Sequence, residues 1–323
     1  MKILITGSNG QLGSELRKII KAGRSELGII PDNIRNARLL CVDIDDVNIE
    51  DMEAVKAMVD SFAPDVIINC AAFTNVNQCE TDRETAFKAN AIGPRNLAAA
   101  AEQLGAKLIH VSTDYVFEGN GKKPYCEWNV CNPQSVYGYT KWLGEQYVRD
   151  FSTKYIIVRT AWLYGYDGNN FVKTIIKTAR EKGALKVVDD QRGNPTNTVD
   201  LAHHLLKLAD TNEYGVYHCT GDGECSWYEF ACEIIRLAKI DCTITPCATE
   251  EYPTPAKRPS YSSLENMMLK CTVGDEMRNW MDALAYFIEH LERIKIWRQC
   301  CQRLENISMN PDIPMILKYS TTS

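Results

Sequence analysis

The sequence predicts an α/β fold, in which a Rossmann-type doubly wound parallel sheet is joined to a smaller C-terminal α/β domain. Three observations support this prediction. Short apolar segments alternate with amphipathic helices through the first half of the chain. A glycine-rich turn connects the first apolar segment to the first helix. The second half loses this regular alternation and includes a proline-rich stretch at residues 246–264.

The individual elements follow from local patterns along the chain. Short apolar runs bounded by turn residues are typical of buried parallel strands, and they occur at residues 2–6, 37–44, 64–73, 106–117 and 154–165. Apolar residues at helical spacing predict helices at residues 11–22, 51–62 and 84–105. The last of these helices contains Gly93-Pro94, where we expect a bend. A turn-rich loop at residues 118–134 then leads into a helix that carries Tyr137.

The bulk properties exclude several classes of protein. The 323 residues are 45% hydrophobic and 24% charged, which is ordinary for a soluble globular chain. A net charge of −6 argues against a nucleic-acid surface, and no apolar run reaches the roughly 18 residues of a membrane span. The N-terminus lacks the features of a signal peptide. The 13 cysteines form no C-x-x-C pair, so we expect reduced thiols, no structural zinc site and a cytoplasmic location.

The segment TGSNGQLG places glycines at positions 7, 10 and 13, between the first strand and the first helix. Such a turn lets the backbone approach a pyrophosphate, which then lies at the N-terminus of the helix. The position of the turn therefore predicts a dinucleotide site that includes Gly7, Gly10 and Gly13. The alternative is a tight strand-to-helix turn without a ligand.

A dinucleotide site also requires an acidic residue after the second strand, to bind the adenosine ribose. Asp32 has the usual spacing, whereas Asp43 lies 30 residues beyond Gly13. We favour Asp43, because its strand is longer and the next helix follows directly, which makes residues 23–37 an insertion. Either acid favours NAD over NADP, since a 2′-phosphate requires a cation instead.

Two further motifs carry groups suited to chemistry. In VSTDYVFEG, a strand ends in Ser112, Thr113 and Asp114, where a parallel sheet presents its ligands; these side chains could equally cap the following loop. In SVYGYTKWLGE, helical spacing pairs Tyr137 with Lys141 and turns Tyr139 away. A neighbouring ammonium lowers the pKa of a phenol toward neutrality and makes it an efficient acid–base group. By itself, this pair could also be a chance surface contact.

Seven segments together carry a family resemblance. They are TGSNGQLG, NCAAFTNVNQCE, KANAIGPRNLA, STDYVFEG, NPQSVYGYTKWLGE, VRTAWLYG and AKRPSYSSL. The chain resembles the extended short-chain dehydrogenase/reductase superfamily and, within it, the family of dTDP-4-dehydrorhamnose reductases. The resemblance extends over about residues 1–292, and the STDYVF and RTAWLYG segments are specific to that family.

The resemblance implies reduction of dTDP-4-dehydro-β-L-rhamnose to dTDP-L-rhamnose by NADH or NADPH, with NADH slightly favoured. The implied catalytic residues are Thr113, Tyr137 and Lys141. The expected cofactor contacts are Gly7, Gly10, Gln11, Leu12, Gly13, Asp43, Asn48, Ile49, Ala71, Ala72, Thr74, Tyr137 and Lys141. The expected substrate contacts are Thr74, Thr113, Asp114, Trp162 and Arg258. A dTDP-sugar is thus the expected ligand, with neither nucleic acid nor membrane as a partner.

The resemblance also implies that the chain is divided into two domains. Residues 1–165 and 190–220 are expected to form the NAD(P)-binding domain, and residues 166–189 and 221–292 the substrate-binding domain. The tail at 293–323 has no counterpart and no predicted role.

The sequence departs from the family pattern at one position in the expected site. Phe73 replaces a common histidine, so the substrate preference could differ. Some family members bind Mg²⁺ at a dimer contact through glutamates. Glu15 has a suitable position, but we interpret it as part of an exposed, solvated helix face and assign no metal; a homodimer is compatible with the sequence but not specified by it.

The sequence is also compatible with two alternative functions. One is a nucleotide-sugar epimerase or dehydratase on the same scaffold, although dehydratases usually place an acid–base pair beside the strand-end threonine, and here Tyr115 follows Thr113-Asp114. The other is a non-catalytic, cofactor-binding regulatory subunit, like that of methionine adenosyltransferase, which resembles the same family.

Overall fold

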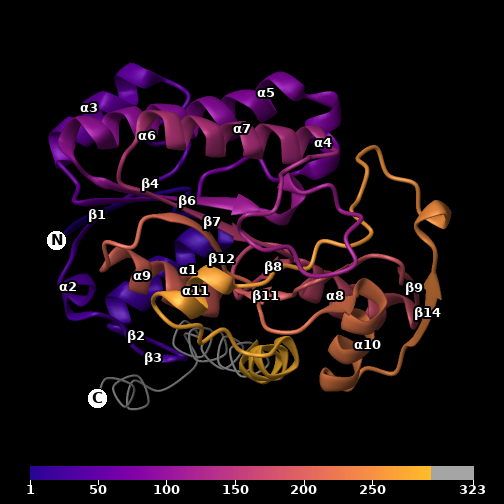
Figure 1. The fold of residues 1–323 in the computed structure, drawn as a ribbon. Coiled ribbons are helices and arrows are strands. Elements are labelled where there is room, and N and C mark those ends of the chain that lie inside the picture. Colours follow the sequence, from indigo (N-terminus) through magenta and orange to yellow (C-terminus); the bar gives the residue numbers. More distant parts are fainter. Residues whose placement is uncertain (292–323) are drawn as a thin grey trace, which may run out of the picture.

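The computed structural model describes residues 1–291, and its centre is a six-stranded, fully parallel sheet (Figure 1). The spatial order of the strands is β12-β7-β6-β5-β1-β4. These strands are β1 (Lys2–Thr6), β4 (Arg38–Val42), β5 (Val66–Asn69), β6 (Lys107–Thr113), β7 (Tyr155–Thr160) and β12 (Gly215–His218). The predicted doubly wound parallel sheet is therefore confirmed. The tail at 293–323 lies outside the described residues.

Helices cover both faces of this sheet. The helices and helical turns are α1 (Gln11–Ala22), α2 (Asp32–Arg35), α3 (Met52–Phe62), α4 (Val76–Thr81), α5 (Arg83–Phe87), η1 (Lys88–Ile92), α6 (Gly93–Leu104), η2 (Asp114–Val116), α7 (Val136–Phe151), α8 (Phe171–Lys182), α9 (Thr198–Ala209), α10 (Trp227–Leu237), η3 (Thr249–Glu251) and α11 (Met267–Cys271). In Figure 1, α3, α6 and α7 lie on one side of the sheet, and α1 and α9 on the other.

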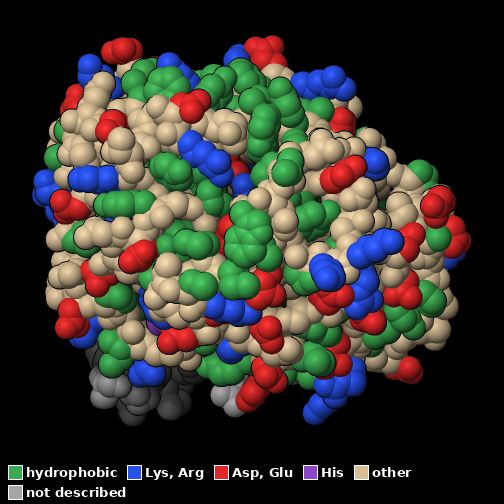
Figure 2. All heavy atoms as spheres, in the orientation of Figure 1, with side chains coloured by type: hydrophobic (Ala, Val, Ile, Leu, Met, Phe, Trp, Pro, Cys, Tyr) green, Lys and Arg blue, Asp and Glu red, His purple; other side chains and the backbone are tan. Residues whose placement is uncertain are grey.

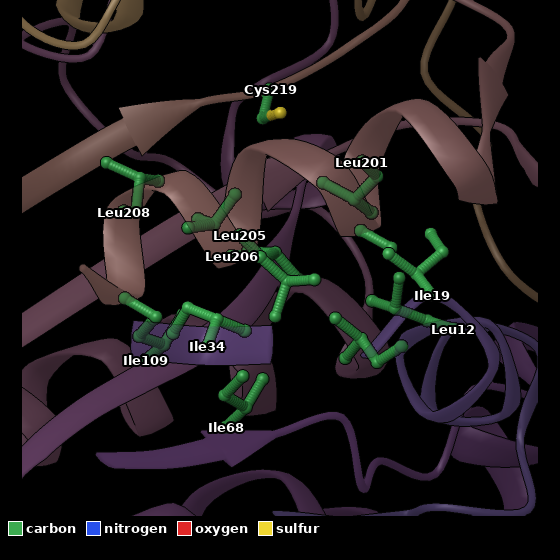
Figure 3. Packing of buried hydrophobic residues seen from close by; sticks show 14 of the residues in the cluster. Leu12, Ile19, Ile34, Ile68, Ile109, Leu201, Leu205, Leu206, Leu208 and Cys219 are labelled. Atoms are coloured by element: carbon green, nitrogen blue, oxygen red, sulfur yellow. The ribbon is translucent and has the colours of Figure 1, made fainter. Parts of the chain in front are cut away.

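The side chains of each strand point alternately to the two faces of the sheet, and this explains why helices pack on both faces. Successive strand side chains point to opposite faces, so Ile3 and Ile5 pack against α1 and α9, while Leu4 packs under α3 and α6. Figure 3 shows the first of these layers, where leucines of α9 meet Leu12 and Ile19 of α1 above the strand residues. Because both faces are covered, the middle residues of β1 and β5 are apolar and buried, as expected for a parallel sheet.

The chain reverses direction across the sheet next to β1. It first moves outward to β4, then crosses to β5 on the other side of β1 and continues outward through β6 and β7. The connections after β1 and β5 therefore leave in opposite directions and open a crevice at the carboxyl ends of these strands.

A second apolar cluster lies beyond the sheet. It joins α8 and α10 to residues of the helix at 280–291. Strand β9 (Ala184–Val188) pairs in parallel with β14 (Thr243–Cys247) beside these helices. Two small ladders, β8 (Leu163–Tyr164) with β11 (Thr196–Asn197) and β10 (Arg192–Gly193) with β13 (Cys225–Ser226), lie where the chain crosses between the clusters.

These elements can be compared with the predicted domain segments. Helix α8 and strand β9 fall within 166–189, and α10 and β14 fall within 221–292. Strand β12 falls within 190–220 and completes the central sheet. The division into two domains itself remains a prediction.

The segment at 23–37 links the central sheet layer to the second cluster. It contains a hairpin, β2 (Arg24–Ser25) with β3 (Gly28–Ile29), and helix α2. Ser25 Oγ lies 2.8 Å from His203 Nδ1 on α9. At the hairpin tip, Glu26 accepts hydrogen bonds from Tyr166 (3.0 Å) and from Arg278 (2.8 Å). This segment therefore makes specific contacts with residues far along the chain.

The helix expected over residues 84–105 has three parts. The π-helical turn η1 separates α5 from α6 and ends directly before Gly93-Pro94, where we expected a bend. The widened turn directs the Asn90 side chain inward, where it exchanges two hydrogen bonds with the backbone of Phe73, at 2.8 and 3.0 Å. Asn90 of η1 therefore holds the segment that follows β5.

The surface carries mixed charge. On the face shown in Figure 2, acidic and basic side chains are interspersed, with hydrophobic side chains between them. Among the described residues, no helix is long and apolar enough to span a membrane. The cysteines of residues 1–291 are present as free thiols.

The close contact of α7 with η1 gives a first testable prediction. A Cβ added at Gly144 would lie 2.2 Å from the carbonyl oxygen of Asn90. We therefore expect Gly144→Ala to lower the free energy of unfolding by about 2 kcal/mol, through overpacking, as measured by urea denaturation. Gly183→Ala is the control, because nothing lies within 4 Å of its added Cβ and only the left-handed backbone (φ +67°) is strained. Equal losses in the two variants would contradict the packing explanation.

Candidate active site

A cavity of about 850 Å³ opens at the carboxyl ends of the central strands. Its walls come from the ends of β1, β4, β5, β6 and β7, from α7, and from residues of the second cluster. All the expected catalytic, cofactor and substrate residues line this one cavity. The cavity is large enough for more than one small ligand.

The glycine turn forms one end of the cavity. Gly7 has φ +65°, and a Cβ there would lie 2.6 Å from the backbone nitrogen of Ala71. A Cβ at Gly13 would lie 2.3 Å from the carbonyl oxygen of Gly7. Helix α1 starts at Gly10 without a side-chain cap and without an acidic residue in its first turn. Its N-terminal N–H groups are therefore suited to an anionic ligand such as a pyrophosphate.

Asp43 closes this end of the cavity. It follows β4, and its carboxylate accepts hydrogen bonds from the backbone nitrogens of Asn9 (2.8 Å) and Ile44 (2.9 Å). The alternative acid, Asp32, lies in α2, pairs with Arg35 and does not line the cavity. The structure thus brings Asp43, and not Asp32, to the glycine turn. Asn48 and Ile49 lie on the same wall.

The segment after β5 forms the floor between the two ends of the cavity. Ala71, Ala72, Phe73 and Thr74 all line it. Because Asn90 hydrogen bonds both backbone groups of Phe73, the position of this segment is fixed by the backbone and leaves the ring of Phe73 free to contact a ligand.

Helix α7 brings Tyr137 and Lys141 to the cavity. It begins at Ser135, whose hydroxyl accepts a hydrogen bond from the backbone nitrogen of Gly138 (3.1 Å). A Cβ at Gly138 would lie 2.2 Å from the carbonyl oxygen of Tyr115, so the helix meets η2 at backbone distance. Tyr137 and Lys141 line the cavity, whereas Tyr139 is 50% exposed.

The protonation of Tyr137 differs from the expectation. Burial raises the pKa of Tyr137, and a hydrogen bond from Thr113 only partly opposes this effect. The predicted lowering by Lys141 is wrong for this structure, because desolvation of the phenolate dominates and the Lys141 ammonium donates to the carbonyl oxygen of Val111 (2.6 Å). Tyr137 is therefore a protonated phenol at neutral pH, which suits a proton donor.

Lys141 is itself affected by burial. Burial lowers the pKa of Lys141 to about 8, and the nearby Glu145 carboxylate opposes this change. The side chain is therefore mainly an ammonium at neutral pH and loses its charge as the pH rises above about 8.

Thr113 and Asp114 lie beside the phenol. Thr113 Oγ1 donates to Asp114 Oδ1 (2.9 Å) and also accepts from the backbone nitrogen of Tyr115 (3.3 Å), so it caps η2 as well as lining the cavity. Burial raises the pKa of Asp114 to about 6, although the Ser262 hydroxyl favours the charged form. Within residues 1–291, Asp114 Oδ2 is buried and makes no hydrogen bond of good geometry.

Two stacked indoles form a side wall. The rings of Trp162 and Trp227 lie 3.5 Å apart with an interplanar angle of 7°, and both line the cavity. Trp162 has a left-handed backbone (φ +47°), and its ring lies so close to Gly193 that a Cβ there would approach it to 2.7 Å. The sequence prediction missed Trp227. The only local signal is its position at the start of the amphipathic helix α10, after the capping residue Ser226.

Arg258 reaches the cavity from the proline-rich stretch. Its guanidinium donates to the hydroxyl of Tyr115 (3.0 Å) and to Oδ1 of Asn77 (3.2 Å). Sequence reasoning gave no role to Tyr115 or Asn77. The ring of Tyr115 also packs edge-on against Tyr137, at 5.5 Å between centroids, so it connects the cation with the phenol.

Glu15 is not the exposed residue that we expected. It is only 6% exposed, and burial raises its pKa to about 7. The expectation failed because residues distant in sequence, Glu26 of the hairpin and Asp167, lie beside this position of α1. Over the described part of the chain, no cluster of three or more His, Cys, Asp or Glu side chains is arranged to hold a metal ion.

Comparison with known proteins is consistent with this site. The family model described as "RmlD substrate binding domain" matches residues 1–293. A crystal structure of a dTDP-4-dehydrorhamnose reductase from Clostridium acetobutylicum is 51% identical, with a TM-score of 0.85 over 90% of this chain and 100% of that one. The corresponding reductase from Bacillus anthracis, solved in complex with NADP, is 39% identical, with a TM-score of 0.84 over 90% and 99% of the two chains. A spore coat polysaccharide biosynthesis protein of Bacillus subtilis is 38% identical, over 89% of this chain and 97% of its own length.

The indole stack gives a second testable prediction. Stacked indoles couple their electronic transitions, so we expect an exciton couplet in the circular dichroism spectrum of the protein. Gly193→Ala should weaken this couplet by displacing Trp162, and Trp227→Phe should abolish it. Trp128→Phe is the control, because Trp128 is exposed and outside the cavity. A couplet that survives in Trp227→Phe would show that these two rings are not stacked in solution.

Proposed function

The chain belongs to the RmlD substrate binding domain family, the family of the dTDP-4-dehydrorhamnose reductases, and on this basis we propose that it reduces dTDP-4-dehydro-β-L-rhamnose to dTDP-L-rhamnose with NADH or NADPH. The observation that carries the proposal is a single cavity that joins a pyrophosphate-type glycine turn to a buried, protonated Tyr137 beside Thr113. Bound NAD(P)H supplies the hydride that reduces the carbonyl carbon at C4 of the sugar.

The protein supplies the proton. As the hydride reaches C4, negative charge develops on the carbonyl oxygen, and Tyr137 donates its phenolic proton there, leaving a hydroxyl on the sugar and a phenolate on the enzyme. Thr113, which donates to Asp114 in the free site, turns its proton toward the same oxygen and stabilises the charge. Lys141 lines the same cavity and offers its ammonium to the nicotinamide ribose, and solvent restores the phenolic proton for the next turnover.

The same cavity offers groups for the rest of the substrate. Asp114 lines the cavity and is a candidate contact for a sugar hydroxyl. The paired indoles of Trp162 and Trp227 offer an apolar wall for the 6-deoxy carbon. Arg258 provides a cation for the diphosphate, held in place by Tyr115 and Asn77.

The cofactor preference follows from Asp43. Its carboxylate lies where the adenosine ribose is expected, and a carboxylate binds ribose hydroxyls but repels a 2′-phosphate. We therefore infer that both dinucleotides are accepted and that NADH is favoured. A cytoplasmic location remains part of this proposal and is supported by the free thiols of residues 1–291.

The alternative functions receive less support. A dehydratase would require a further acid–base pair beside Thr113, and the residue there is Tyr115, which binds Arg258. A purely regulatory role does not require Tyr137, Lys141 and Thr113 to line one cavity, as they do.

A third prediction tests the proton donor. Tyr137→Phe should lower kcat by about 10²–10⁴-fold, because it removes the general acid, while the affinity for NADH changes by only a few-fold. Oxidation of NADH by dTDP-4-dehydro-β-L-rhamnose, followed by absorbance, gives the rate. Tyr139→Phe is the matched control, since Tyr139 lies on the same helix but is half exposed. Undiminished turnover in Tyr137→Phe would refute the assignment, and no turnover in the wild type would refute the proposed substrate.

A fourth prediction concerns the sugar. The backbone of Phe73 is fixed by Asn90, so Phe73→His changes only the ring that faces the cavity. We expect the ratio of kcat/KM between dTDP-4-dehydro-β-L-rhamnose and its epimer dTDP-4-keto-6-deoxy-D-glucose to change by roughly 10-fold or more, because one ring contact is replaced by a polar one. The KM for NADH should stay constant. An unchanged ratio would remove Phe73 from the specificity determinants.

A further inference from the structure

A buried carboxylate with no role in the steps above lies on the same face of α7 as the proposed proton donor. Glu145 follows Lys141 by four residues, and Lys141 follows Tyr137 by four, so the three side chains lie in one row along the helix. Glu145 is 0% exposed, and it does not line the cavity. A charge buried in this way requires specific partners.

Both oxygens of Glu145 are bound by the two strands beneath the helix. Arg159 of β7 donates from Nε to Oε1 (2.9 Å) and from Nη2 to Oε2 (2.7 Å). Ser112 of β6 donates to Oε1 (2.6 Å). Ser112 directly precedes the catalytic-site residue Thr113, and Arg159 directly precedes Thr160, which lines the cavity. The carboxylate therefore fixes α7 to the ends of both strands that carry the site.

Arg159 makes several contacts in addition to its ion pair with Glu145. Arg159 is 1% exposed, and its guanidinium also contacts the carbonyl oxygen of Glu127 (3.4 Å) and Sγ of Cys131 (3.2 Å). It lies over the ring of Phe117, 5.0 Å from the centroid. Glu145 is thus bound to a rigid group and cannot shift without breaking several contacts.

The charge state of Lys141 depends on the Glu145 carboxylate. Lys141 and Arg159 are buried cations; Glu145 is paired with Arg159 and follows Lys141 by one turn of α7. Burial lowers the pKa of Lys141 to about 8, and Glu145 acts in the opposite direction. Without this carboxylate, the ammonium of Lys141 would lose the nearby anion that opposes the effect of its burial.

From this geometry we propose that Glu145 is a positioning residue of the active site, whose carboxylate, held by Arg159 and Ser112, orients the row of α7 side chains and balances the ammonium of Lys141. The inference rests on the proposed reductase function for its catalytic meaning. Stability alone does not explain the pair, because a buried ion pair can often be replaced by apolar side chains without loss of stability.

Other titratable and charged groups also face this region, from each element packed against Lys141. They are Cys70 after β5, Cys79 and Glu80 of α4, His110 of β6, Asp114 and Tyr115 of η2, Tyr137 of α7 and Arg159 of β7. Burial raises the pKa of Cys70 to about 12 and lowers that of His110, so neither group carries charge near neutral pH. Glu145 is therefore the anion with the largest effect on Lys141.

The test is the isosteric variant Glu145→Gln, examined in two ways. Carbon-13 NMR of labelled lysine, assigned with Lys141→Met, follows the titration of Lys141 without any need for activity. The pH dependence of kcat/KM follows the same group during turnover. We expect both midpoints to fall by about one pH unit, the effect of losing an opposite charge at close range. At a pH above both midpoints, this shift is a roughly tenfold loss of kcat/KM.

Two further variants separate positioning from folding. Glu145→Gln leaves Arg159 unpaired, so the double variant Glu145→Gln/Arg159→Met removes both charges and should regain stability while keeping the lowered midpoint. Asp200→Asn is the matched control, because Asp200 is a buried carboxylate paired with Arg278 away from α7. It should leave the Lys141 midpoint unchanged.

Each outcome is decisive. Lowered midpoints in both Glu145 variants, with Asp200→Asn like the wild type, support the inference. An unchanged Lys141 titration in Glu145→Gln overturns it, whatever the activity. Absence of turnover in the wild type would refute the proposed function, yet the NMR titration would still decide whether Glu145 balances Lys141.

Discussion

The close packing of α7 against the sheet is the constraint on which the site depends. At Gly138 and Gly144, the helix approaches η2 and η1 so closely that a Cβ would lie 2.2 Å from a backbone oxygen. These contacts set the depth and rotation of α7, and the Glu145–Arg159 pair holds its register against β6 and β7. Because the helix cannot rotate or slide, Tyr137 reaches the strand end that carries Thr113. A side chain at either glycine would move the phenol relative to the carbonyl it serves.

Desolvation then decides the charge states within this packed region. It raises the pKa values of Tyr137 and Asp114 and lowers that of Lys141. Neighbouring groups modify these effects without reversing them, so burial is the dominant cause at all three residues. For a reductase this is a useful result, since the phenol holds its proton until negative charge develops on the substrate oxygen. The ammonium of Lys141 does not reverse this effect, because it donates to the carbonyl oxygen of Val111.

The site also depends on contacts between the sheet layer and the second cluster. Trp227 of α10 completes an aromatic wall with Trp162, and Arg258 crosses to Tyr115 and Asn77. On the opposite side, the hairpin at 23–31 places Glu26 against Arg278 and Tyr166. These hydrogen bonds and the stacked indole rings hold the second cluster against the sheet layer. A substrate that contacts both parts would bind between them.

The sequence by itself determined the parallel α/β architecture, the glycine turn and the placement of Tyr137 and Lys141 on one helix, because these follow from periodicity and from backbone freedom at single positions. The fold and the family resemblance were confirmed, while the roles of the individual site residues remain predictions. Only the tertiary structure could reveal Trp227, Asn90 and the buried state of Glu15, since each depends on which distant element packs against it. The direction of the Tyr137 pKa shift was decided in the same way, because desolvation depends on surroundings that no local pattern records.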